Sequence, residues 1–318
     1  MPRSTVPASL DPSGPAADSI AGLWWLLLGA GTVIFLLVVA LLVIPMLRRR
    51  RTPESTIDDD HREEVPSRLA TGWIVGLGVV MTGVLLVAVL VVSVTTMRDV
   101  SRAAPAGSLR IDVIGYQYWW DVRYPDHGVT TANEINIPVG QPVEIRLTSA
   151  DVIHSFWAPE LHGKLDALPD GTNVLVLRAD RPGVYGGECA EFCGIQHTNM
   201  GFRVVAQPLE QFNGWLNLHR QSAAGADQPG AQVFRAEGCA ECHVIRGVTA
   251  DMAAQPGPDL THVASRERIA SDTIDNTATN LADWLRDPGA VKPGTTMPTP
   301  DLTDEQIEQL VTYLDGLT

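Results

Sequence analysis

The chain has 318 residues and a formal net charge of −14, so it is long enough for more than one domain and is a poor match for nucleic acid. The acidity favours a basic or a small partner, and acidic residues outnumber basic ones most strongly after residue 225. The cysteines form two pairs with metal-type spacing, Cys189/Cys193 and Cys239/Cys242, which leaves none for a structural disulfide.

The first hundred residues predict a flexible arm and two membrane spans. Residues 1–19 are rich in Pro, Ser and Ala, which is typical of a flexible arm. Residues 20–47 carry no charge and exceed the roughly 20 residues that a spanning helix needs. A cleaved signal peptide is the alternative, but its basic residues precede the apolar run, whereas four arginines follow it here, at positions 48–51. By the positive-inside rule these arginines lie in the cytoplasm, and the N-terminus lies outside.

A second uncharged run, residues 69–97, follows a short charged loop at 52–68. The two runs together predict a helical hairpin across the membrane, spans 20–47 and 69–97. Such a hairpin returns the chain to the outer side, so everything after residue 98 is expected there.

From residue 108 the pattern changes to short runs rich in β-formers and separated by Pro, Gly and Asn. Several short strands at this spacing predict an antiparallel sandwich or barrel, over residues 105–220. The runs are 110–124, 134–138, 142–148, 172–178 and 202–205. Residues 207–220 then predict a helix, and the small, polar residues 221–230 predict a flexible linker.

The loop at residues 187–200 concentrates side chains that bind soft metal ions: Cys189, Glu191, Cys193, His197 and Met200. Thiolates, imidazole and thioether favour copper over magnesium or calcium. Two Cys four residues apart allow both sulfurs to bridge two copper ions, and His154 upstream offers one more imidazole. A zinc site or a Cys189–Cys193 disulfide is the alternative, but neither explains Met200.

The segment 239–243 reads C-x-x-C-H, which predicts covalent haem attachment. Cys239 and Cys242 would bind the haem as thioethers, and His243 would be the proximal iron ligand. A redox C-x-x-C or half of a zinc site is the alternative, although no second Cys pair remains for zinc. Residues 302–317 predict a closing amphipathic helix that Thr303 can cap.

Two motifs together carry a family resemblance, HSFWAPEL at 154–161 and GECAEFCGIQHTNM at 187–200. They resemble the binuclear copper (CuA) site of subunit II of haem–copper cytochrome c oxidases. The resemblance implies a cupredoxin-like Greek-key β-barrel with copper at one end. It also implies a magnesium ion that the Glu191 carboxylate reaches at the contact with subunit I. The implied copper ligands are His154, Cys189, Cys193, His197, Met200 and the backbone carbonyl of Glu191.

Two positions depart from this family. The aromatic residue after the Gln of GYQYWW, which receives electrons in the family, is usually Trp; here it is Tyr118, with Trp119 one place later. The implied electron inlet is therefore Tyr118 and Trp119. The Glu that feeds protons to subunit I sits three residues before a Trp in the family, and Ala70 occupies that position here, before Trp73.

The C-terminal stretch resembles an all-α class-I cytochrome c domain, residues 231–318. GPDL at 257–260 resembles the segment whose Pro carbonyl holds the proximal His, and KPGTTMP at 292–298 resembles the loop of the sixth ligand, here Met297. Met252 is the alternative ligand, but it lies only a few residues past His243.

The complete pattern is that of a multidomain membrane protein similar to subunit II of bacterial caa-type cytochrome c oxidases. The resemblance implies electron flow from a donor, cytochrome c or a quinol–cytochrome c reductase, through haem c and CuA to the oxygen-reducing site of subunit I. It further implies proton pumping by the complex, a subunit III, and location in the bacterial plasma membrane with both metal domains outside. A quinol oxidase subunit is one alternative, although those homologues lack the copper ligands. A tethered electron carrier for a nitric or nitrous oxide reductase is another.

Overall fold

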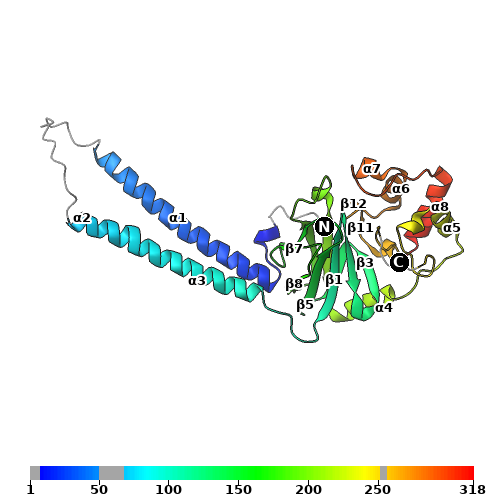
Figure 1. Cartoon of the computed structure of the whole chain (residues 1–318), viewed down its shortest axis with the longest axis horizontal. Helices are drawn as coiled ribbons and strands as arrows, with labels where there is room; N and C mark the ends of the chain where they lie inside the picture. The colour runs from blue at the N-terminus through cyan, green and yellow to red at the C-terminus, as the bar shows by residue number, and fades with distance from the viewer. Residues whose placement is uncertain (1–7, 50–67, 251–255) are drawn as a thin grey trace. The chain divides into compact units, whose positions relative to one another are not determined.

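The computed structural model describes residues 8–49, 68–250 and 256–318 (Figure 1). The described chain divides into two units: residues 19–100 form one, and residues up to 18 together with 101–318 form the other. Within the second unit we distinguish a sandwich domain, residues 109–219, and a helical domain, residues 229–318.

Two long helical segments make up the first unit. Both are long and apolar enough to cross a membrane, and their large apolar side chains are exposed, as expected of a surface that faces lipid. The helices extend beyond the apolar runs 20–47 and 69–97 at both ends. Their bounds are α1 (Pro15–Arg49), α2 (Arg68–Trp73), the π-helical segment η2 (Ile74–Met81) and α3 (Thr82–Val100).

The flexible arm expected over residues 1–19 is wrong for residues 11–18. Ser13 donates its N–H to the Glu160 carbonyl at 2.7 Å, and its own carbonyl accepts from the Asp180 N–H at 2.8 Å. Ala17 is buried. The small, polar composition that suggested flexibility instead allows a close backbone contact with the sandwich domain, because Gly14 lies against the Arg178 carbonyl. Residues 1–7 lie outside the described residues.

The sandwich domain consists of two five-stranded sheets. Their inward side chains alternate with outward ones and enclose a single apolar core. The first sheet, in spatial order, is β3 (Val129–Ala132), β2 (Trp119–Tyr124), β1 (Leu109–Tyr116), β5 (Val143–Ser149) and β8 (Asn173–Leu177). The second is β4 (Glu134–Pro138), β10 (Gly201–Gln207), β9 (Gly183–Cys189), β6 (His154–Trp157) and β7 (Leu165–Ala167).

Most neighbouring strands are antiparallel, but β1 pairs with β5 and β4 with β10 in parallel. The cupredoxin-like fold that the resemblance implied is confirmed, and its strands form a sandwich of two sheets. One expectation within it is wrong: residues 110–124 do not form a single run, because the chain turns at Gln117 and Tyr118 and brings β2 back against β1.

Helix α4 (Leu209–His219) closes the sandwich domain and buries Phe212, Leu216 and His219. The segment 221–230 is not the free linker that its composition predicted. The Ala223 N–H donates to the Arg246 carbonyl at 2.8 Å, and the last two residues already belong to the next helix. The segment is therefore part of the packed structure.

The helical domain has its own apolar core, to which helices α5 (Pro229–Ala236), α6 (Ala278–Arg286) and α8 (Asp304–Asp315) and a small hairpin contribute. The predicted closing helix is confirmed: Thr303 caps it in a capping box with Gln306. The other regular elements of this domain are β11 (Arg268–Ile269), β12 (Ile274–Asp275) and α7 (Pro288–Val291). Short 3₁₀ turns occur at η1 (Ala8–Leu10), η3 (Pro125–His127), η4 (His197–Asn199), η5 (Cys239–Glu241) and η6 (Val263–Ser265).

Candidate metal centres

Five soft or borderline donor atoms lie together at one end of the sandwich. Cys189 Sγ is 3.8 Å from Cys193 Sγ and 3.9 Å from His154 Nδ1. Cys193 Sγ is in turn 3.8 Å from His197 Nδ1 and 3.8 Å from Met200 Sδ. The structure thus brings together all five side chains that the sequence singled out as copper ligands.

Strand ends bring the upstream histidine to the loop. Strand β6 begins at His154 and β9 ends at Cys189, and the two strands pair through Phe156 and Cys189. Position 115 in β1 lies directly beneath the His154 ring and must be glycine, because a Cβ there would lie 2.6 Å from the ring. The first sheet therefore sets the position of a ligand carried by the second.

A carboxylate fixes the orientation of His154. Its Nε2 lies 2.7 Å from Asp151 Oδ1, so Nε2 donates and Nδ1 presents its lone pair to the sulfur cluster. Burial by itself lowers the pKa of His154, but the hydrogen bond to Asp151 and the proximity of Cys189 raise it overall. The pKa of Asp151 is lowered despite its partial burial, because His154 and the N–H groups of Gln117 and Val152 donate to it.

The two cysteine side chains lie in contact. The contact with Cys193 lowers the pKa of Cys189, and the same contact, together with burial, raises the pKa of Cys193. The backbone carbonyl of Glu191 lies 3.3 Å from Cys189 Sγ, while the Glu191 side chain is exposed. Two sulfurs, two imidazole nitrogens, a thioether and a carbonyl fit a copper pair. They do not fit an all-oxygen cation site.

Trp120 supports this cluster from the core side. It is fully buried, packs edge-on against the His154 ring at 5.8 Å, and lies within 3.5 Å of the Met200 carbonyl through Nε1. Trp120, Asp151 and Gln117 are functional candidates that the sequence pattern did not single out. Gln117 and Trp120 belong to the GYQYWW segment, and Asp151 lies three residues before His154. These positions were the only signal that the sequence offered.

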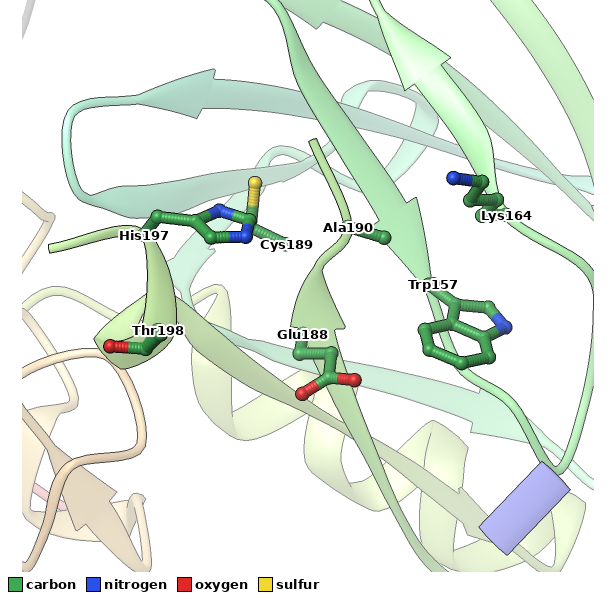
Figure 2. Close-up of a pocket in the computed structure, with 7 residues that line it drawn as sticks. All are labelled: Trp157, Lys164, Glu188, Cys189, Ala190, His197 and Thr198. Atoms are coloured by element: carbon green, nitrogen blue, oxygen red, sulfur yellow. The ribbon is translucent and has the colours of Figure 1, made fainter. Parts of the chain in front are cut away.

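A pocket opens beside the cluster (Figure 2). It has a volume of about 500 Å³, and Cys189 and His197 reach it from the loop. Lys164 and Glu188 add one charge of each sign to its wall. The candidate copper site is thus approachable from outside the sandwich domain.

The C-x-x-C-H segment lines a cavity in the helical domain. Cys239, Cys242, His243 and Met297 all face this cavity. His243 Nδ1 donates to the Pro258 carbonyl at 2.8 Å, which is the hydrogen bond expected from the sequence, and it leaves Nε2 free as a ligand. Burial lowers the pKa of His243, which favours the neutral ring that binds iron. Met252 lies outside the described residues.

The cavity fits a haem in its donors and in its wall. Most of its lining is apolar, and three cationic residues line it, Arg266, Arg268 and Lys292. Among the described residues, Arg266 Nε is a buried donor without a hydrogen-bond partner. Burial lowers the pKa of Lys292 to about 7. Buried cations of this kind suit the carboxylates that a haem carries.

Tyr118 and Trp119 lie at the boundary between the two candidate sites. Both line the haem cavity, although they belong to the sandwich domain. The Tyr118 hydroxyl packs against Gly194 in the copper-ligand loop, and Trp119 is buried and stacks on Tyr116 with ring centres 4.7 Å apart. The two aromatics are therefore covered by the helical domain of the same chain.

Comparison with known families assigns both domains. Residues 127–207 match the periplasmic domain of cytochrome C oxidase subunit II, and residues 228–318 match cytochrome c. The chain combines a subunit II periplasmic domain with a cytochrome c domain. The first of these domains implies a CuA copper centre, and the second implies haem c.

Two relatives and one solved structure are similar to parts of this chain. "Cytochrome c oxidase subunit 2" of Alkalihalophilus pseudofirmus is 38% identical over 213 residues, which cover 65% of this chain and 60% of the relative. The subunit of the same description from Bacillus sp. PS3 is 35% identical, covering 65% and 62%. The chain thus spans about three fifths of the length of these relatives.

One solved structure is also similar in sequence. The periplasmic domain of oxidase subunit II (CoxB) of Bradyrhizobium japonicum has 28% identity and a TM-score of 0.36, covering 37% of this chain and 97% of that domain.

Proposed function

We propose that this chain is the electron-accepting subunit II of a caa-type cytochrome c oxidase. The observation that carries the proposal is the arrangement of two candidate centres in one unit, with their ligand loops in contact. The Gln196 side chain, next to His197, donates to the carbonyl of Pro293 in the Met297 loop. This hydrogen bond and the peptide bond from Gln196 to His197 connect the helical domain, where electrons arrive, to a copper ligand.

The proposed ligands follow from the donor geometry. The copper pair would be held by His154, Cys189, Cys193, His197, Met200 and the carbonyl of Glu191. The haem would be held by Cys239 and Cys242 as thioethers and by His243 and Met297 as iron ligands. When bound, these groups would supply one-electron redox chemistry.

The protein's contribution is to hold these ligands still. Asp151 fixes the ring of His154, and Pro258 fixes the ring of His243. A rigid, buried ligand set changes little between oxidation states, so electron transfer needs little rearrangement. Tyr118 and Trp119, between the haem cavity and the copper loop, form the inlet from one centre to the other.

The partners in this proposal are the other oxidase subunits and an electron donor. Subunit I receives electrons from the copper pair, and a magnesium ion at the exposed Glu191 carboxylate belongs to the contact with subunit I. The pocket beside Cys189 and His197 leaves that face approachable (Figure 2). The donor, cytochrome c or a quinol–cytochrome c reductase, meets the acidic helical domain first, and subunit III completes the complex.

The two apolar helical segments anchor the subunit in the bacterial plasma membrane, with both metal domains outside. The complex pumps protons. Because Ala70 stands where the family has a Glu, the proton path starts at another residue of this chain or in another subunit. A tethered carrier for a nitric or nitrous oxide reductase would have the same metal sites. Gentle purification of the complex and its absorption spectrum separate the two: haem a bands support the oxidase, and their absence with copper and haem c present supports the carrier.

A further inference from the structure

The turn at residues 117–118, which joins β1 to β2, contacts both domains. Its two carbonyls face the helical domain: Gln117 O accepts from Thr296 Oγ1 at 3.1 Å, and Tyr118 O accepts from Ser271 Oγ at 2.6 Å and from Lys292 Nζ at 3.0 Å. Lys292 is 2% exposed. Among the described residues, no acidic side chain lies within ion-pair distance of it, so these backbone acceptors are what hold its ammonium group.

The other side of the same turn faces the copper ligands. Gln117 Nε2 donates to the carbonyl of Cys193 at 2.5 Å. The Gln117 N–H donates to Asp151 Oδ2 at 2.7 Å, and the second oxygen of that carboxylate holds His154. One glutamine thus contacts one copper ligand directly and orients a second through Asp151.

We propose that Gln117 is a positioning residue that couples the two candidate metal centres. The proposal rests on the proposed function and adds to it a residue that binds neither metal. Gln117 joins the Met297 loop, through Thr296, to the copper ligands Cys193 and His154. It thereby helps to fix the separation of the centres and supplies a second hydrogen-bonded connection between their ligand loops, beside the direct one from Gln196 to Pro293.

A turn residue with only a structural role would affect stability and nothing else. The Gln117 side chain makes its hydrogen bond to the copper-ligand loop rather than to the turn itself, so its loss leaves the Cys193 carbonyl without that donor. The copper spectrum and the rate of transfer between the centres therefore separate a positioning role from a structural one.

The test compares three variants of the complete oxidase complex. Gln117→Leu removes the bond to Cys193 and keeps the side-chain size. Thr296→Val removes the bond to the Gln117 carbonyl and leaves the copper side intact. Gln232→Leu is the matched control, because Gln232 is exposed on α5 and its side chain donates to the Asp227 carbonyl, outside the copper-ligand loop. The measurements are the copper absorption and paramagnetic resonance spectra, haem content, and the rate of haem-to-copper transfer after photoreduction.

We expect Gln117→Leu to shift the copper spectrum and to slow the internal transfer several-fold. Thr296→Val slows the transfer while leaving the copper spectrum unchanged, and Gln232→Leu changes neither. An unaltered copper spectrum and transfer rate in Gln117→Leu would overturn the proposal. The failure of the proposed function itself looks different: the unmodified protein would then lack the copper signal, the haem signal, or any transfer between them.

Discussion

One histidine at each candidate metal centre, His154 or His243, is held in the same way. One ring nitrogen donates to a fixed oxygen, and a glycine allows the ring to lie directly on the backbone. The two sets are His154 with Asp151 and Gly115, and His243 with Pro258 and Gly257. A Cβ at Gly257 would lie 2.7 Å from the ring of His243. Substituting either glycine would displace a ligand without removing it.

Replacing Asp151 by Ala removes the acceptor that orients His154. We expect copper affinity to fall by about 10–100-fold, the usual effect of losing an outer hydrogen-bond partner of a metal-bound histidine. Competition with a copper chelator measures this effect, and haem content should stay unchanged. Asp170→Ala, at an exposed position in the same domain, is the control. Equal affinities of Asp151→Ala and the control would contradict the orienting role.

Met297 is expected to control the haem potential. Methionine raises the iron potential relative to a nitrogen ligand, so Met297→His should lower it and remove the weak absorption of sulfur–iron ligation. Turnover should slow with a natural donor and fall less with a strong artificial reductant. Met252→His should do none of this. If Met252 controls that absorption instead, the sixth ligand has been assigned to the wrong residue.

At the scale of elements, the end of α4 joins the sandwich domain to the helical domain through buried aromatic and imidazole rings. His219 stacks on Trp215 with ring centres 4.3 Å apart and lies 4.6 Å from the ring of His262. His262 also contacts the Gln221 carbonyl at 3.1 Å. This cluster is one of the places where the two domains of the same unit meet, and the chain between them is not a flexible linker.

His219 makes this junction sensitive to acid. Burial, and secondly His262, lower its pKa to about 4, below the ordinary value of 6.5. The unfolded chain therefore binds a proton that the folded chain does not, and stability falls as the pH drops from 6.5 to 4. His219→Phe keeps a ring against Trp215 and should reduce that loss by up to about 3 kcal/mol, at 1.36 kcal/mol per pKa unit.

Thermal unfolding of the intact protein between pH 7 and pH 4 measures this difference. Parallel pH profiles for the unmodified protein and His219→Phe would show that His219 does not cause the acid sensitivity.

At the scale of the whole molecule, two helical segments with exposed apolar surfaces accompany two water-facing domains. Exposed apolar area of that extent is stable only in lipid or against partner helices. By the positive-inside rule, the arginines at 48–51 predict a cytoplasmic turn of the hairpin, so we expect both metal domains on the outer side.

Labelling tests this topology in whole cells. A membrane-impermeant thiol reagent should react with Asp170→Cys in intact cells and with Asp58→Cys only after lysis. The native cysteines lie in the two candidate metal sites, and the unmodified protein gives the background. The opposite pattern of labelling would reverse the orientation of the hairpin.

Much of this organisation was predictable from local patterns. The apolar runs, the strand 134–138, the helix capped by Thr303 and the donor types in the 187–200 loop each depend on residues close together in sequence. Soft ligands at fixed spacing favour the same metal in any rigid fold, and a long uncharged run favours lipid in any context. The sequence by itself therefore determined the candidate metals and the order of the domains.

Tertiary structure decided how these parts contact one another. The ordered segment 11–18, the turn at 117–118 and the packed segment 221–230 all differ from their local patterns, because their hydrogen-bond partners lie far away in the chain. Gln117 is the clearest case: its partners are Asp151, Cys193 and Thr296. No periodicity or motif encodes such contacts, since they arise only when two sheets and a second domain bring distant backbone groups together.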